Sequence, residues 1–288
     1  VSRYLGIPEC NILAGNGASE IIRLVFEALG SKKLFLPGPC FSVYAESAEF
    51  TGTGVEYYRL EERDDFKLDV DRFIASIPRD TDTILICNPN NPTSYLVPKR
   101  DMVKLVEHAS SKNINVVIDE AFIELTADGN DNSVADMLSA HNNIVIIRSL
   151  TKILAIPGLR LGYALGGREL IEKMSRRKIK WSVNSLACKA GIVLEKDKDY
   201  FRRTKEWLTS EMPHFYNKLC CLPNIKVFKP DTNFILVKFT DKKMTSDRFC
   251  ELMIKRGFMV RNASNFKFLD ERYVRIAIKD KYSNNKFY

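Results

Sequence analysis

The chain has 288 residues, of which 45% are hydrophobic and 28% are charged. A chain of this length and apolar content can bury a core, which excludes disorder as its dominant state and favours one large domain with a smaller one. The net charge is +8, which indicates either a surface adapted for solubility or an anionic partner, namely nucleic acid or a phosphorylated small molecule.

Other features of the sequence exclude several classes of protein. No apolar run approaches the roughly 20 residues of a membrane helix, and no secretory signal heads the chain. Neither zinc-finger spacing nor an RNA-binding signature is present, so we expect no nucleic acid and no membrane among its partners. The seven cysteines form no Cys-x-x-Cys pair and the three histidines are not clustered, so we expect a reduced, cytoplasmic protein without a metal site.

Short apolar runs alternate with helical patterns in the first part of the chain. A glycine-containing segment, 15–20, precedes a predicted helix at 21–29, and another helix is predicted at 99–112. Four apolar runs are predicted to be buried strands: 83–87, 114–118, 144–147 and 161–165. Strand, helix and strand in this order imply parallel pairing, and continuous apolar runs imply a sheet covered on both faces. The sequence therefore predicts an α/β fold with a mostly parallel sheet sandwiched by helices.

The last third of the chain has a different pattern. A helical pattern fills 184–222, and the composition shifts after it. Three elements are predicted beyond this point: strands at 225–239 and 258–260 and a helix at 245–256. We therefore predict a large domain over 1–222 and a small α+β domain over 223–288.

Four segments carry polar residues at strand ends or helix starts, where the ligand sites of open α/β sheets lie. They are 15–20, 87–93, 119–122 and 149–163. The first offers backbone N–H groups that suit a phosphate, although a glycine turn with Ser19 as helix N-cap explains it equally well. The second presents an Asn amide from a stiff loop, or is simply a tight turn. The third places Asp119 at a strand end, either as a ligand group or as a helix cap.

The fourth segment, SLTKILAIPGLRLGY, places Lys152 and Arg160 near two hydroxyl residues, Ser149 and Thr151. A single lysine is usually a surface residue, so the prediction rests on the combination. A site that is cationic and rich in hydroxyl donors fits a phosphate beside a lysine that can form a Schiff base.

In this order, the four segments resemble fold-type I pyridoxal-phosphate enzymes of the class I/II aminotransferase group, and the resemblance covers nearly all of the chain. It implies that pyridoxal 5′-phosphate is the cofactor and that Lys152 and Asp119 are catalytic. Lys152 would bind the cofactor covalently, and Asp119 would pair with its ring nitrogen. The residues implied to bind the cofactor are Ala18, Ser19, Phe41, Asn91, Asp119, Ala121, Ser149, Thr151, Lys152 and Arg160. The residues implied to bind the substrate are Asn184 near the ring, Arg275 on the carboxylate and Arg261 on the phosphate.

Two groups of relatives compete within this family. The lysine segment, the WSVNSLA stretch at 181–187 and Phe122 after Asp-Glu-Ala resemble the threonine-phosphate decarboxylases. Histidinol-phosphate aminotransferases more often carry Pro-Tyr/Phe-Asn and a Tyr at these two places. The resemblance therefore implies decarboxylation of L-threonine O-3-phosphate to (R)-1-aminopropan-2-yl phosphate in cobalamin biosynthesis, with a histidinol-phosphate-type aminotransferase as the alternative. A non-catalytic regulator with an aminotransferase-like domain is disfavoured by the intact Lys152 and Asp119.

The chain also departs from the family pattern. The resemblance implies further N-terminal sequence, with a loop over the substrate and a Tyr that reaches the partner's cofactor phosphate in a homodimer with shared active sites. It also implies that the last helix, after Ile278, is cut short here. Ser94 stands where many relatives have Gly, and Phe122 removes one donor to the cofactor oxygen that Asn91 is expected to contact.

Overall fold

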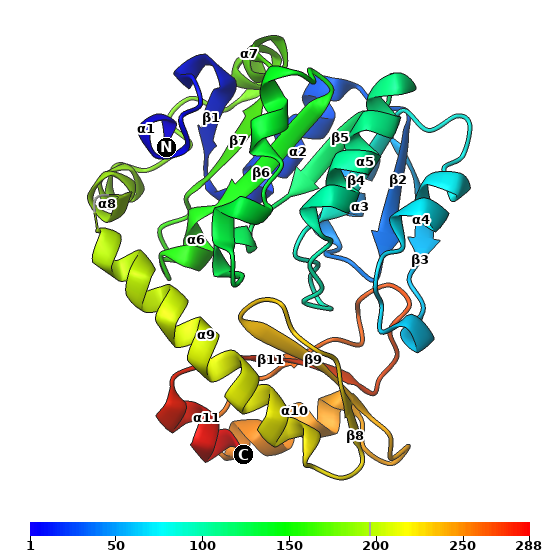
Figure 1. Cartoon of the computed structure of the whole chain (residues 1–288), viewed down its shortest axis with the longest axis vertical. Helices are drawn as coiled ribbons and strands as arrows, with labels where there is room; N and C mark the ends of the chain where they lie inside the picture. The colour runs from blue at the N-terminus through cyan, green and yellow to red at the C-terminus, as the bar shows by residue number, and fades with distance from the viewer. Residues whose placement is uncertain (196) are drawn as a thin grey trace.

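The computed structural model describes residues 1–195 and 197–288. Figure 1 shows a large sheet with helices on both faces, a smaller sheet below it, and the long helix α9 (Lys198–Cys220) running from one to the other. The N-terminus lies on the large unit and the C-terminus on the small one. The predicted α/β class, with a second and smaller unit, is confirmed.

The large sheet has seven strands in the order β1-β7-β6-β5-β4-β2-β3. Their bounds are β1 Ile12–Gly15, β2 Lys33–Gly38, β3 Gly54–Arg59, β4 Thr83–Cys87, β5 Asn115–Asp119, β6 Ile144–Ser149 and β7 Gly162–Gly166. The pairs from β6 to β3 are parallel, as expected, whereas β7 is antiparallel to both of its neighbours. The prediction of a mostly parallel sheet is therefore confirmed, and β7 is an antiparallel exception within it. The connection from β6 holds only the four-residue helix α6 (Leu150–Ile153), so the chain returns from the same end of the sheet.

Helices cover both faces of this sheet. They are α2 Gly17–Leu29, α3 Val43–Phe50, α4 Val70–Ser76, α5 Lys99–Ser111 and α7 Arg168–Arg177. The short α1 Ser2–Leu5 precedes β1, and α8 Ser185–Glu195 lies to one side of the sheet (Figure 1). In β4, Ile84 and Ile86 join the core that α4 and α5 cover, whereas Leu85 and Cys87 join the core under α2, α3 and α7. Because successive strand side chains face opposite sides, a sheet buried on both faces needs an unbroken apolar run.

Helix α2 begins earlier than the sequence pattern indicated. It starts at Gly17, and Asn16 occupies the N-cap position. The interpretation of Ser19 as the helix N-cap is therefore wrong, because Ser19 lies within the first turn. Gly17 has φ +76°, which is accessible to glycine without strain and lets the helix begin directly after β1.

The small unit is built on a four-stranded antiparallel sheet in the order β10-β11-β9-β8. Its elements are β8 Ile225–Val227, β9 Phe234–Phe239, α10 Ser246–Lys255, β10 Arg261–Asn262, β11 Tyr273–Ala277 and α11 Lys281–Phe287. The single strand predicted at 225–239 is thus two strands with a turn between them. The strand predicted at 258–260 is wrong, because those residues are irregular and pairing starts at Arg261.

Helix α9 packs against both units. Phe215 and Leu219, in its second half, are buried in the core of the small sheet, and Leu208 packs with Leu125 and Ile153 of the large unit. The predicted domain boundary at residue 222 falls just after this helix.

The loop after β4 fastens the two units together. Ser94 has φ +67°, and its buried hydroxyl accepts hydrogen bonds from the backbone N–H groups of Asp231 and Thr232, at 3.2 and 3.1 Å. The Leu96 N–H in turn donates to Asp231 Oδ2 at 2.9 Å. A glycine at position 94 would relieve the positive φ, but it would lose both bonds to the hydroxyl. Ser94 therefore makes two hydrogen bonds between the units that a glycine could not make.

Gly162 allows the first turn of α2 to rest on the large sheet. A Cβ at this position would lie 2.7 Å from Ala18 N and 2.8 Å from Arg148 O, and both are backbone atoms. Backbone cannot move aside as the end of a flexible side chain can. Only glycine at position 162 is therefore compatible with the observed position of the α2 N-terminus.

We predict that Gly162→Ala lowers the free energy of unfolding by about 1–3 kcal/mol, because the added methyl group overpacks a rigid contact. The matched control is Gly54→Ala on β3, where a Cβ would lie at an ordinary 3.5 Å from Lys32 O. Urea denaturation of both variants measures the difference. Equal stability of the two variants would contradict the close-approach argument.

Candidate functional site

A cavity of about 290 Å³ lies at the carboxyl ends of β4, β5 and β6, and residues of the small sheet close its other side. Its lining holds twelve residues singled out from the sequence: Ala18, Ser19, Phe41, Asn91, Asp119, Ala121, Ser149, Thr151, Lys152, Arg160, Arg261 and Arg275. The fold thus brings together residues that are up to 257 positions apart in the chain, since Ala18 and Arg275 line the same space.

One wall of the cavity is a cluster of donors that suits an anion. The backbone at Ala18 and Ser19 belongs to the first turn of α2, where N–H groups lack partners within the helix. The hydroxyls of Ser149 and Thr151 lie 2.7 Å apart at the start of α6. The Arg160 guanidinium packs so closely against Gly17 that a Cβ at position 17 would clash with it. The combination of helix N–H groups, hydroxyls and one guanidinium is the donor set that a phosphate monoester requires.

A second wall is formed by the buried carboxylate of Asp119, the last residue of β5. Its Oδ2 accepts a hydrogen bond from the Tyr44 hydroxyl at 2.8 Å, and its Oδ1 accepts one from the Ala121 N–H at 2.9 Å. Burial raises the pKa of Asp119, and the bonds from Tyr44 and Ala121, with the charge of Lys152, oppose this rise.

Tyr44 also lines the cavity, and reasoning from the sequence missed it. Tyr44 lies in the first turn of α3, three residues after Phe41 in PCFSVY, and this local spacing gives no sign of its distant partner Asp119. The two rings meet edge to face, with their centroids 5.7 Å apart.

Lys152 projects into the cavity from α6 and is exposed to it. Its Nζ lies 5.6 Å from the centre of the Phe122 ring. Partial burial, followed by the charges of Arg275 and Arg160, lowers the pKa of Lys152, whereas Asp119 opposes this effect. A lysine with a lowered pKa is more often the neutral amine, which is the form that attacks a carbonyl carbon.

The opposite wall carries two arginines on neighbouring strands. Arg261 of β10 and Arg275 of β11 are directly paired in the antiparallel register. Arg275 lies 4.8 Å above the ring of Phe234, and its guanidinium donates to Asn91 Oδ1. Burial and the charge of Arg261 lower the pKa of Arg275 to about 10. Because the Asn91 oxygen is used by Arg275, the amide nitrogen of Asn91 is left as a donor toward the cavity.

Arg261 is held from its other side by two residues of the loop that follows β10. Its Nη2 donates to Asn265 Oδ1 at 2.9 Å, and its guanidinium lies 5.4 Å from the centre of the Phe266 ring. Asn265 and Phe266 line the cavity as well, and neither was singled out from the sequence.

Asn184 is the one predicted site residue that does not line the cavity. Its Oδ1 accepts from the Ala187 N–H at 2.9 Å, and its Nδ2 donates to Leu159 O at 2.9 Å. The side chain therefore caps the start of α8 and ties it to the loop after α6.

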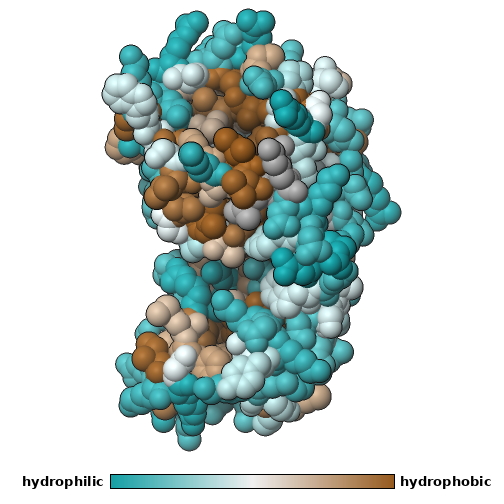
Figure 2. Space-filling model, turned by 90° about the vertical axis from the view of Figure 1, so that its left-hand side faces the viewer, coloured by the Kyte–Doolittle hydropathy of each residue, from teal (hydrophilic) through white to brown (hydrophobic). Residues whose placement is uncertain are grey.

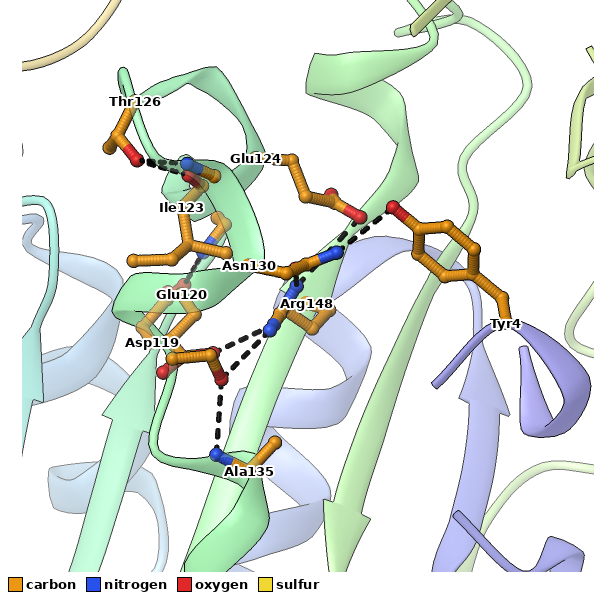
Figure 3. Close-up of polar contacts among 12 residues, drawn as sticks. Tyr4, Asp119, Glu120, Ile123, Glu124, Thr126, Asn130, Ala135 and Arg148 are labelled. Atoms are coloured by element: carbon orange, nitrogen blue, oxygen red, sulfur yellow. Dashed lines mark hydrogen bonds and ion pairs between the residues drawn. The ribbon is translucent and has the colours of Figure 1, made fainter. Parts of the chain in front are cut away.

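A buried ion pair supports the segment that follows Asp119. Arg148 is fully buried on β6, and its Nε donates to Glu120 Oε2 at 2.8 Å. Figure 3 shows the guanidinium also reaching Asn130, whose amide nitrogen donates to the hydroxyl of Tyr4 near the N-terminus. The paired charges satisfy each other inside the core, so Glu120 is not free for chemistry. The pair instead fixes the backbone that carries Ala121 and Phe122.

Within residues 1–195 and 197–288, no group of three or more His, Cys, Asp or Glu side chains could hold a metal ion. No helix in the same ranges is long and apolar enough to cross a membrane.

Comparison with known proteins adds independent evidence. A family model described as aminotransferase class I and II matches residues 1–286. A threonine-phosphate decarboxylase from Salmonella typhimurium is 33% identical over 288 residues, which cover 99% of this chain and 77% of that protein. A histidinol-phosphate aminotransferase from Methanococcus aeolicus is 33% identical over 281 residues, which cover 96% and 74%. The crystal structure of the histidinol-phosphate aminotransferase from Clostridium acetobutylicum superimposes with a TM-score of 0.91 at 32% identity, covering 99% of this chain and 84% of that one.

Proposed function

Because the chain belongs to the family of class I and II aminotransferases, we propose that it decarboxylates a small phosphorylated amino acid, L-threonine O-3-phosphate. The product would be (R)-1-aminopropan-2-yl phosphate, a step of cobalamin biosynthesis. The cofactor is pyridoxal 5′-phosphate. When bound, it withdraws electrons from the substrate α-carbon and stabilises the negative charge that bond cleavage leaves there.

The donor sets of the cavity fit this cofactor. The N–H groups of the first turn of α2, with Ser149, Thr151 and Arg160, would hold the cofactor phosphate. Lys152 would bind the cofactor covalently. The carboxylate of Asp119 would accept a hydrogen bond from the protonated ring nitrogen, and the amide nitrogen of Asn91 would donate to the phenolate oxygen. Phe41 and Ala121 line the cavity and would enclose the two faces of the ring.

The observation that carries the proposal is the pairing of Arg261 with Arg275. Like charges on directly opposed residues of two strands destabilise a sheet, and Arg261 lowers the pKa of Arg275. A ligand with two anionic groups relieves this repulsion. A phosphorylated amino acid has both a carboxylate and a phosphate, and the two arginines line the same cavity as Lys152.

Two separate arginines would also orient the substrate. With the carboxylate on Arg275 and the phosphate on Arg261, the α-carbon is held at two points, and its bonds take fixed directions. The direction of these bonds decides which one breaks. Lys152, with its lowered pKa, can then deliver a proton to the α-carbon after carbon dioxide has left.

A second candidate function is transamination of the histidinol-phosphate type. A groove of about 840 Å³ adjoins the cavity and shares Phe122, Lys152, Arg261 and Arg275 with it. Its remaining lining includes the aromatic residues Phe215, Phe234, Phe258 and Phe287. A substrate larger than threonine phosphate, with a flat ring, would find apolar contacts there. Removal of the α-proton instead of carbon dioxide would then lead to transamination.

We also propose that the chain works as a cytoplasmic homodimer. Figure 2 shows apolar side chains gathered on the side of the large unit that carries α8. Leu186, Ile192 and Val193 of that helix are exposed, as are Ile179 and Trp181 just before it. An apolar surface of this kind is typical of a protein–protein interface.

The unpaired state of all seven cysteines fits a reducing compartment.

The product formed from L-threonine O-3-phosphate tests the proposed reaction. We expect the purified protein, loaded with pyridoxal 5′-phosphate, to release carbon dioxide and an aminopropanol phosphate. Lys152→Ala should abolish turnover, because no other amine replaces Lys152 at the α-carbon. Lys112→Ala, at the end of α5, is the matched control and should keep full turnover. A keto acid as the product would contradict the proposal and favour the second candidate.

We also predict that the two arginines bind different groups of the substrate. Arg261→Ala should weaken the binding of threonine phosphate by about tenfold to a hundredfold, as expected for one charge-assisted contact, and should hardly affect threonine. Arg275→Ala should weaken both ligands, because it removes the carboxylate partner.

Binding titrations of both ligands against both variants measure this difference, with Arg256→Ala as a control at an exposed arginine of the small unit. Equal losses for threonine and its phosphate on Arg261→Ala would show that the phosphate lies elsewhere.

A further inference from the structure

We propose that Tyr44 is a positioning residue that keeps the Asp119 carboxylate ionised and in one orientation, and so sets how firmly the cofactor ring nitrogen holds its proton. The inference rests on the proposed pairing of Asp119 with that nitrogen and adds a residue that controls Asp119 itself. Tyr44 would touch neither the substrate nor the ring nitrogen, but would act on the reaction through Asp119.

The carboxylate of Asp119 is fixed from two directions. Tyr44, on α3, donates to Oδ2 at 2.8 Å, and the Ala121 N–H, on the segment after β5, donates to Oδ1 at 2.9 Å. Rotation of the carboxylate about its Cβ–Cγ bond would lengthen both bonds together. Each oxygen still has a lone pair available, so a third donor can approach without displacing the other two.

The structure holds the hydroxyl of Tyr44 in place. Only 1% of Tyr44 is exposed, and its ring packs edge to face against Phe41. The thiol of Cys87, on β4, also lies within hydrogen-bond reach of the hydroxyl, but that thiol donates to Pro89 O at 3.3 Å. The single proton of the Tyr44 hydroxyl is therefore committed to Asp119.

Among the groups that stabilise the charge on Asp119, Tyr44 is the one whose protonation state changes least with pH. Burial raises the pKa of Tyr44 well above its usual value, so it remains a neutral donor over the working pH range. Lys152 favours the charged carboxylate as well, but its own pKa is lowered, so its positive charge is less permanent. Glu120 and Cys87 are the other titratable groups near Asp119: Glu120 is paired with Arg148, and burial keeps Cys87 a neutral thiol.

The sign of the effect follows from competition for one proton. A carboxylate that accepts two hydrogen bonds is a weak base, so the shared proton stays on the ring nitrogen. Removal of the Tyr44 hydroxyl makes Asp119 more basic, and the proton moves toward the carboxylate. The ring then withdraws electrons less strongly from the substrate α-carbon, and turnover falls.

The experiment compares Tyr44→Phe with the parent protein, both loaded with the cofactor labelled with ¹⁵N at its ring nitrogen. We expect covalent binding at full stoichiometry, a nitrogen resonance shifted toward the unprotonated position, and a higher pH midpoint for the visible absorption change of the bound cofactor. Turnover should fall about tenfold with little change in KM, as expected for one hydrogen bond to a charged group.

Two further variants separate positioning from a general structural effect. Tyr57→Phe removes a half-buried hydroxyl on β3, outside the cavity, and should leave the nitrogen resonance unchanged. In an Asp119→Asn background, Tyr44→Phe should have no further effect on the resonance or on the pH midpoint.

Two outcomes would overturn the inference, and they can be told apart. If the parent resonance is protonated and Tyr44→Phe leaves it unchanged, the role of Tyr44 fails while the role of Asp119 stands. If the parent resonance is already unprotonated, the proposed pairing of Asp119 fails as well.

Discussion

The proposed chemistry depends on one constraint, namely a carboxylate that must stay charged while almost no water reaches it. Asp119 is 3% exposed at the end of a central strand, and burial alone would favour its neutral form. The fold provides Tyr44 from α3 and the Ala121 N–H from the segment after β5 as donors. That segment is anchored in turn by the buried pair of Arg148 with Glu120. The core of the large unit and the chemistry of the cavity are therefore coupled through these few bonds.

The small unit completes the site by bringing cations to it. Its antiparallel pair β10–β11 places Arg261 and Arg275 opposite each other, and Arg275 reaches across to Asn91 on the loop after β4. The same loop is fastened to the small unit through Ser94. The contacts between the units thus fix the positions of the two arginines relative to Lys152, which neither unit could do alone. The repulsion among these cations is the physical reason that we propose an anionic substrate.

Local patterns in the sequence predicted the parts of the structure that depend on neighbours in the chain. The unbroken apolar run at Thr83–Cys87 indicated a strand buried on both faces, and the four polar segments indicated where ligands would lie. The antiparallel direction of β7 and the late start of β10 depend on contacts between distant residues, which local periodicity does not report. Tyr44 was missed for the same reason, since its partner is 75 positions away. Asn184 matched a family motif, yet here its side chain caps a helix.

The attachment of the cofactor to Lys152 is the central claim, and one measurement tests it directly. The protein is loaded with pyridoxal 5′-phosphate, reduced with borohydride and digested, and the modified peptide is located by mass spectrometry. The account predicts a single pyridoxyl group on Lys152, because this is the one lysine among the described residues that lines the cavity with Asp119 and the phosphate-binding donors. A group on any other lysine, or none after full reduction, would contradict it.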